Sequence, residues 1–177
     1  MTNPRSNDVD LLRRLRRGDE EAFMTIYRSH QGPVYRFALR MSGSPAAAED
    51  VTQEVFLALI GGRDGYDQRR GALRSYLFGV ARNQVCKRLD RPQPPRAEEA
   101  RAAPGEDVAA VREAVQALPV PFREVVVLCE LEGLSYEEAA EVCGVPVGTI
   151  RSRLHRARAQ LLASLGGEAE PETERRP

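Results

Sequence analysis

The stretch LSYEEAAEVCGVPVGTIRSRLHRARAQLLASL, residues 134–165, decides how the C-terminal part of this chain folds. Ser135 and Glu138 have the spacing of a capping box, in which the Ser hydroxyl accepts a backbone N–H of the first turn and the Glu carboxylate reaches back to the backbone N–H of the Ser. Gly144 stands where a short helix needs a left-handed residue to end. Pro146 suits the first turn of a following helix. A short helix, a glycine turn and a longer helix make the helix-turn-helix pattern.

The longer helix of this stretch is predicted to have an apolar side and a basic side. Apolar residues recur at intervals of four, three and four, and the buried stripe comprises Ile150, Leu154, Ala157 and Leu161. The exposed residues predicted to read base edges in a major groove are Arg151, Ser152, His155 and Arg156. Arg153 and Arg158 lie nearer the edges of the stripe and are predicted to bind phosphates. We therefore predict DNA reading, against the alternative of a solvated basic face.

Charge is distributed in blocks, although the 177 residues include 26 Lys+Arg and 26 Asp+Glu and carry no net charge. Residues 60–92 hold 8 basic and 3 acidic groups, and residues 142–165 hold four arginines and no acid. Residues 98–141, between them, hold 11 acidic and 3 basic groups. Salt screens charges beyond about 8–10 Å. The two basic blocks can therefore bind a polyanion whatever the total charge.

Composition divides the chain into two helical units. The segment RPQPPRAEEARAAPGE, residues 91–106, has no aliphatic side chain larger than Ala and is typical of a linker. We predict an all-α fold of two small domains joined by a flexible linker, because no segment shows the period-2 alternation of a strand. The predicted parts are a first domain 8–91, the linker 92–106, a helix-turn-helix domain 107–165 and a disordered tail 166–177.

Helical spacing of apolar residues predicts the individual helices. In the N-terminal unit the helical segments are 8–28, whose apolar stripe is interrupted by the polar stretch 16–21 around Gly18, then a short helix 34–41 after the break at Gly32-Pro33, 45–60 and 72–91. Two more, 108–118 and 121–132, are expected before the helix-turn-helix.

The sequence contains no catalytic, cofactor-binding or metal-binding constellation, and we expect a protein that is not an enzyme. His30 and His155 lie in different predicted domains, and GGRDG at 61–65 lacks the lysine of a phosphate-binding loop. No apolar run approaches the roughly 20 residues that span a bilayer. The N-terminus has no signal-peptide core, so the expected location is the cytoplasm.

Three cysteines, Cys86, Cys129 and Cys143, have neither the spacing of a disulfide framework nor that of a zinc site. We interpret them as small core residues. A redox pair of Cys129 and Cys143 is the alternative.

Three segments, in this order along the chain, resemble one family. AEDVTQEVFL is similar to region 2.2, SYLFGVARNQVCKRLDR to region 2.4 and GTIRSRLHRARAQL to the region 4.2 recognition helix of bacterial RNA polymerase sigma factors of the extracytoplasmic-function (ECF) group. The resemblance covers about residues 8–90 and 107–165. One departure is Tyr76-Leu77, where the family commonly has Trp before the Leu.

The resemblance implies a subunit that binds core RNA polymerase and directs initiation at promoters with −10 and −35 elements. The implied contacts of the β′ clamp are Asp50, Gln53, Glu54 and Phe56, with a position in the core as the alternative for Phe56. The implied contacts of the −10 element, around a pocket for a flipped base, are Tyr66, Asp67, Arg82, Asn83 and Lys87. The −35 element would be read by the exposed side of the last helix, and the implied contacts are Arg151, Ser152, His155 and Arg156, with Arg153 and Arg158 on the phosphates.

The family also implies further partners. The acidic segment 98–141 would support the fold and meet the polymerase β flap, and an anti-sigma factor would be wedged between the two domains. One alternative is a stand-alone helix-turn-helix regulator, which predicts a ligand cavity or a dimer interface in residues 8–90. Another is a module that only sequesters a protein partner, which leaves the basic helix without a use.

Overall fold

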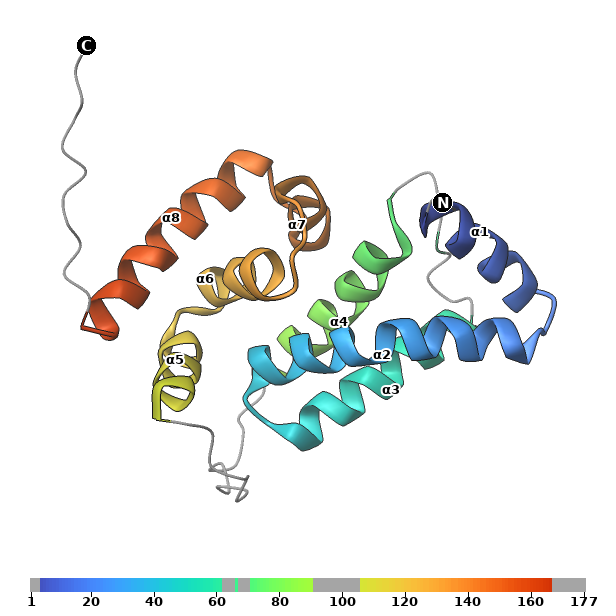
Figure 1. The fold of residues 1–177 in the computed structure, drawn as a ribbon, viewed down its shortest axis with the longest axis horizontal. Coiled ribbons are helices and arrows are strands. Elements are labelled where there is room, and N and C mark those ends of the chain that lie inside the picture. Colours follow the sequence, from blue (N-terminus) through green and yellow to red (C-terminus); the bar gives the residue numbers. More distant parts are fainter. Residues whose placement is uncertain (1–3, 62–65, 67–70, 91–105, 167–177) are drawn as a thin grey trace, which may run out of the picture.

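The computed structural model describes residues 4–61, 66, 71–90 and 106–166, and these are helical apart from short connections (Figure 1). The N-terminal unit consists of α1 (Pro4–Leu15), α2 (Glu20–Ser42), α3 (Pro45–Gly61) and α4 (Leu73–Leu89). The C-terminal unit consists of α5 (Glu106–Ala117), α6 (Val120–Val125), the π-helix η1 (Val126–Leu131), α7 (Tyr136–Cys143) and α8 (Val147–Ser164). The predicted all-α class is confirmed for these residues. Most of the predicted linker and tail lies outside them.

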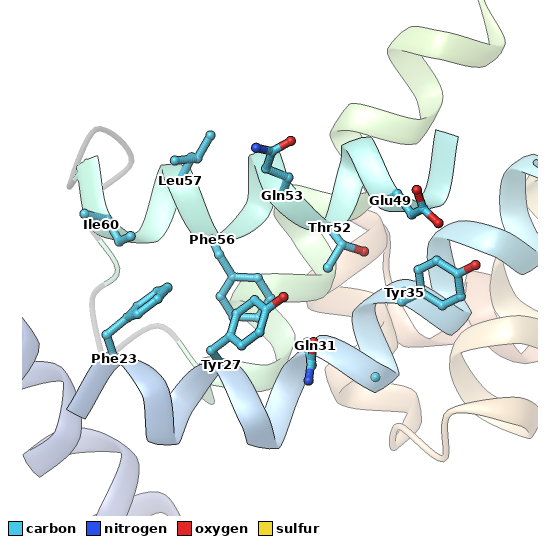
Figure 2. Close-up of a pocket in the computed structure, with 11 residues that line it drawn as sticks. Phe23, Tyr27, Gln31, Tyr35, Glu49, Thr52, Gln53, Phe56, Leu57 and Ile60 are labelled. Atoms are coloured by element: carbon cyan, nitrogen blue, oxygen red, sulfur yellow. The ribbon is translucent and has the colours of Figure 1, made fainter. Parts of the chain in front are cut away.

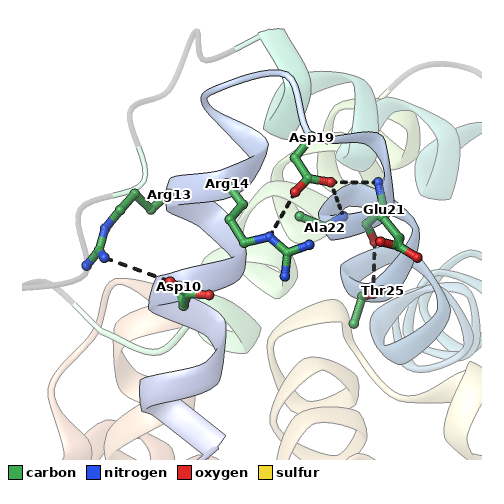
Figure 3. Close-up of polar contacts among 7 residues, drawn as sticks. All are labelled: Asp10, Arg13, Arg14, Asp19, Glu21, Ala22 and Thr25. Atoms are coloured by element: carbon green, nitrogen blue, oxygen red, sulfur yellow. Dashed lines mark hydrogen bonds and ion pairs between the residues drawn. The ribbon is translucent and has the colours of Figure 1, made fainter.

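Asp19 begins α2. Its Oδ1 accepts the N–H groups of Glu21 and Ala22 at 3.0 and 3.1 Å, and Arg14 Nε donates to its Oδ2 at 2.8 Å (Figure 3). These bonds, first of all that from Arg14, lower the pKa of the Asp19 carboxyl. The apolar spacing over 8–28 is therefore shared by two helices: α1 ends at Leu15, and the N-cap Asp19 starts α2 inside the polar stretch 16–21 that interrupts the stripe.

The break predicted at Gly32-Pro33 is wrong, because α2 runs through it without interruption. A proline inside a helix costs about 3 kcal/mol. On either side of it Ile26, Val34 and Phe37 are at most 1% exposed. Burying each such side chain contributes about 1.5–3 kcal/mol, so the packed face outweighs the proline.

The core of the N-terminal unit lies between α2, α3 and α4. Phe37 on α2 and Phe78 on α4 meet edge to face with ring centroids 5.4 Å apart, and both are at most 1% exposed. This packing orients the outer faces of α3 and α4, which carry the predicted contact residues.

The helix-turn-helix is confirmed with its predicted local signals. Ser135 Oγ accepts the N–H of Glu138 at 3.1 Å, and Glu138 Oε2 accepts the N–H of Ser135 at 2.9 Å. Gly144 ends α7 in the left-handed conformation, at φ 65°. The following helix begins at Val147, so that Pro146 is its N-cap residue rather than its first helical residue.

The helix predicted over 121–132 is α6 followed by the wider turns of η1. The N–H of Glu132 bonds to the carbonyl of Val127, five residues earlier, at 2.9 Å. Gly133, at φ 69°, then turns the chain. The Glu132 side chain is left almost fully enclosed, at 1% exposure.

The two units are in direct contact, which the sequence analysis did not predict. Figure 1 shows α7 beside α4 and α6 beside α2, and close backbone approaches join both pairs. The relative position of the units is therefore determined by a packed interface as well as by the connecting chain.

All three cysteines are free thiols and are half-buried or buried. Burial raises the pKa of the Cys129 thiol to about 11 and also raises the pKa of Cys86 and Cys143. A protonated thiol is a poor nucleophile, which supports their interpretation as packing residues.

The first prediction concerns the capping box. Ser135→Ala should lower the free energy of unfolding by about 1 kcal/mol, because a first-turn N–H of α7 loses its acceptor. Urea titration followed by circular dichroism measures the difference. Ser164→Ala is the matched control, since that exposed hydroxyl donates to the Leu161 carbonyl near the end of α8. An equal loss in both variants would contradict the role of the capping box.

The second prediction concerns Cys129. With a pKa of about 11 against about 8.5 for a free thiol, its thiolate fraction at pH 7.5 is more than a hundredfold lower. Iodoacetamide should therefore modify Cys129 at least a hundredfold more slowly than a free cysteine peptide, and the rate should rise with pH up to about 11. Mass spectrometry of the native protein measures both. Rapid modification at pH 7.5 would support a redox role instead.

Candidate nucleic-acid interface

Helix α8 presents the residues predicted to read DNA bases. Ile150, Leu154 and Ala157 face its own unit and are at most 1% exposed, while Leu161 is half-buried. The exposed residues on its other sides include the predicted base-reading set, Arg151, Ser152, His155 and Arg156. The predicted apolar stripe thus anchors the helix and leaves its polar side open to a ligand.

The two arginines predicted to bind phosphate differ in their surroundings. Arg158 Nη2 lies 2.5 Å from Glu130 Oε1, and the two side chains are 55% and 40% exposed. Exposed ion pairs contribute at most about 1 kcal/mol, so a phosphate can replace this carboxylate. Arg153 is half-buried at the edge of the stripe.

Tyr66 connects the segment after α3 to the start of α4. Its hydroxyl donates to the Gly71 carbonyl at 2.9 Å, its ring lies edge to face with Tyr76 at 5.3 Å, and Arg16 donates to its carbonyl at 2.8 Å. These three contacts hold the half-buried Tyr66 in place. Asp67, predicted beside it, lies outside the described residues.

The residues of α4 that were predicted to contact the −10 element differ in exposure and in their partners. Asn83 and Lys87 are exposed and lie one turn apart. Arg82 is half-buried, and its Nε donates to the carboxylate of Glu124 on α6, which is 2% exposed. Arg82 therefore faces the C-terminal unit, whereas Asn83 and Lys87 are exposed, and the predicted contact of all three with the −10 element stays a prediction.

On α3, the predicted clamp contacts also have different surroundings. Asp50 and Gln53 are exposed. Glu54 accepts two bonds from the Arg88 guanidinium, at 2.7 and 3.2 Å. That bidentate pair ties α3 to α4, so Glu54 already has a partner inside the unit.

Phe56 is a buried residue of an aromatic cluster. It is 3% exposed, and its ring lies 4.8 Å from that of Tyr27 and 6.4 Å from that of Phe23, both edge to face. The cluster forms the floor of a groove of about 650 Å³ between α2 and α3 (Figure 2).

Two apolar side chains on the rim of this groove were missed by the sequence analysis. Leu57 and Ile60 are 58% and 54% exposed, and both line the groove with Gln53 and Glu49. The sequence contained a signal for these two residues, because both fall outside the buried stripe of α3, which comprises Ala48, Val51, Val55 and Leu59. Large apolar residues that cluster outside such a stripe indicate a contact surface.

Among the described residues, no group of three or more His, Cys, Asp or Glu side chains is arranged to hold a metal ion. No described helix is long and apolar enough to cross a membrane.

Comparison with known families identifies both units. Residues 26–93 match Sigma-70 region 2, and residues 109–161 match Sigma-70 region 4. The chain is 38% identical over 168 residues to the ECF RNA polymerase sigma factor SigC of Mycobacterium tuberculosis, covering 88% of each chain. It is 36% identical to SigE of Mycolicibacterium smegmatis, over 81% of this chain and 63% of that protein.

Solved structures show the same fold. CnrH, in complex with the cytosolic domain of CnrY, superposes with a TM-score of 0.72 at 26% identity, covering 92% of this chain and 99% of that one. The sigma factor RpoE of Bartonella quintana, in complex with the anti-sigma factor NepR, gives a TM-score of 0.70 at 25% identity, over 83% and 98% of the two chains.

These matches decide against the stand-alone regulator and the sequestering module. Both predicted sigma regions are present in their order, and the helix-turn-helix occupies the second of them. The chain belongs to the ECF group of RNA polymerase sigma factors, the subunits that bind the polymerase and direct promoter-specific initiation of transcription.

Proposed function

We propose that this sigma factor reads the −35 element with α8, contacts the −10 element with α4 and the segment around Tyr66, and docks on the polymerase through the groove between α2 and α3. The observation that carries this assignment is the open basic side of α8 on a helix-turn-helix, where Ile150, Leu154 and Ala157 on the opposite side of α8 are buried.

The chemistry of α8 suits readout in the major groove. Arg151 lies in the N-terminal half of the helix, the part that contacts base edges in helix-turn-helix proteins. Arginine can donate two parallel hydrogen bonds to guanine, which contributes about 1–3 kcal/mol of discrimination. Arg153 and Arg158 would contact phosphates and set the orientation of the helix.

The groove suits a helical segment of the polymerase clamp. Leu57 and Ile60 offer apolar area on the rim, and Glu49, Asp50 and Gln53 offer polar contacts beside it. An apolar centre with a polar edge is the usual composition of a protein interface. Phe56 supports this surface from below.

On the −10 side, Asn83 and Lys87 are the residues open to DNA, and Tyr66 would form one wall of the pocket for the flipped base. Arg82 would join them once Glu124 is released. Asp67 stays part of the proposal on the sequence alone.

Further partners follow from the family. An anti-sigma factor is proposed because the RpoE structure is a complex with one. Contact with the β flap is retained for the exposed acids of the C-terminal unit, but Glu124 and Glu132 face the N-terminal unit instead. We place the protein in the cytoplasm with the polymerase and assign nucleotide transfer to the polymerase, with no cofactor of its own.

In vitro transcription with core polymerase is the direct experiment. A template carrying the promoter should give a defined transcript only when this protein is added. Initiation by the core enzyme alone at the same start site, or no product from any template enriched by genomic selection, would contradict the proposal.

Two substitutions on α8 should separate base reading from phosphate binding. Arg151→Ala should reduce discrimination between the cognate −35 element and a single-base mismatch by about 1–3 kcal/mol. Arg158→Ala should weaken binding equally for both sequences and reduce the salt slope by about 1. Competition binding by the holoenzyme at several salt concentrations measures both quantities. Arg112→Ala, an exposed arginine on α5, is the control.

The clamp contact has its own test. Leu57→Asp should weaken binding to core polymerase at least tenfold, because it places a charge on the apolar rim of the groove. Met24→Asp is the matched control, since Met24 is an exposed apolar residue of α2 that does not line the groove. Fluorescence anisotropy of the labelled chain gives both dissociation constants, and equal constants would rule out the groove.

A further inference from the structure

Arg16, in the turn between α1 and α2, bonds to the backbone of Tyr66, which lies 50 positions further along the chain. Its Nη2 donates to the Tyr66 carbonyl at 2.8 Å. The side chain of Tyr66 is held by residues that are closer in sequence. Its hydroxyl donates to the Gly71 carbonyl at 2.9 Å, and its ring lies edge to face with that of Tyr76, with centroids 5.3 Å apart. The turn after α1 therefore contacts the backbone of a residue whose side chain is held from the α4 side.

The turn that carries Arg16 has a fixed position. Leu11 and Leu12 of α1 are 7% and 6% exposed and belong to the hydrophobic core. Arg14 Nε donates to Asp19 Oδ2 at 2.8 Å, and Asp19 caps the first turn of α2 (Figure 3). Both ends of the turn are thus attached to packed helices, and the Arg16 side chain starts from a defined backbone position.

The bond from Arg16 acts on the course of the chain at Tyr66. The direction of a carbonyl defines the plane of the peptide that follows, because that unit is rigid and planar. A guanidinium that holds the Tyr66 carbonyl therefore restrains the backbone, in addition to the restraints on the ring. A donor with a positive charge also makes a stronger hydrogen bond than a neutral one.

A pocket for a flipped base benefits from such a restraint. Extruding a base costs stacking and pairing energy. A binding site that must also order its own wall when the ligand arrives binds more weakly, because the lost conformational freedom is subtracted from the binding free energy. A wall that is held before DNA arrives avoids this second cost.

We propose that Arg16 is a positioning residue for the −10 element: it holds the Tyr66 backbone, so that one wall of the flipped-base pocket is formed before DNA binds. This role rests on the proposed contact of Tyr66 with the −10 element. Arg16 precedes residues 26–93, which match Sigma-70 region 2. Recognition of the −10 element thus extends to a turn that lies before that match.

Base-specific binding by the holoenzyme tests this role. Core polymerase with the full-length chain is titrated with a fragment, from a template enriched by genomic selection, whose non-template −10 element is single-stranded. At each position of the element in turn, the base is compared with an abasic site, and the ratio of the two dissociation constants measures capture of that base. In Arg16→Ala this ratio should fall about fivefold at the flipped position, the equivalent of one hydrogen bond. Phosphate contacts cancel in the ratio, because both fragments have the same backbone.

Arg17→Ala is the matched control, since it removes the same charge from an exposed side chain in the same turn. Its ratio should equal that of the unchanged chain. An equal fall in Arg16→Ala and Arg17→Ala would overturn the proposal, because the loss of positive charge in the turn would then explain the effect without the bond to Tyr66.

Arg16→Lys is the second variant. A bond to one exposed carbonyl needs a single cationic donor on a long side chain and not the planar fork of arginine. Its ratio should therefore stay within about twofold of that of the unchanged chain. A ratio as low as that of Arg16→Ala would contradict the assigned role of the donor.

The outcomes separate this role from the proposed function of the −10 surface. If the unchanged chain prefers the base over the abasic site at no position of the element, base capture is absent, and both the proposed −10 contact and the role of Arg16 are wrong. If the unchanged chain captures a base and Arg16→Ala captures it equally well, the role of Arg16 is wrong and the −10 contact stands.

Discussion

The arrangement of the two units depends on two buried carboxylates and the arginines that surround them. Glu124 and Glu132 are 2% and 1% exposed, and their side-chain ion pairs reach into the N-terminal unit. Because a buried carboxylate is costly unless a cation neutralises it, these pairs restrict how α6 and η1 can sit on α2 and α4. Apolar packing between α4 and α7 completes the interface.

Because of this constraint, the two helices proposed to contact DNA, α8 and α4, differ in how much of their basic surface is exposed. The basic side of α8 is open, since its buried stripe faces its own unit. On α4, Asn83 and Lys87 are exposed but Arg82 is held by Glu124. A chain with no net charge can thus keep one basic surface available and one partly neutralised. The acidic block between the two basic blocks supplies the neutralising groups.

Local signals predicted the helix-turn-helix correctly because they act within a few residues. Ser135, Glu138 and Gly144 act on the backbone of their own helix, and the stripe of α8 follows from helical periodicity alone. Predictions failed where packing outweighed a local preference. Pro33, which was predicted to interrupt the helix, lies inside a continuous one. For Phe56 the sequence left a clamp contact and a core position open, and the structure buries its ring in an aromatic cluster.

The sequence by itself determined the helical class, the order of the two sigma regions, and the residues on the open side of α8. Each of these depends on spacing along one helix or on a motif read in order. Only the tertiary structure decided which charges pair. Arg36 bonds to Glu132 across 96 residues of chain, and helical spacing carries no information about such a partner. The same holds for the groove between α2 and α3, whose floor is formed by aromatic side chains that come from both helices.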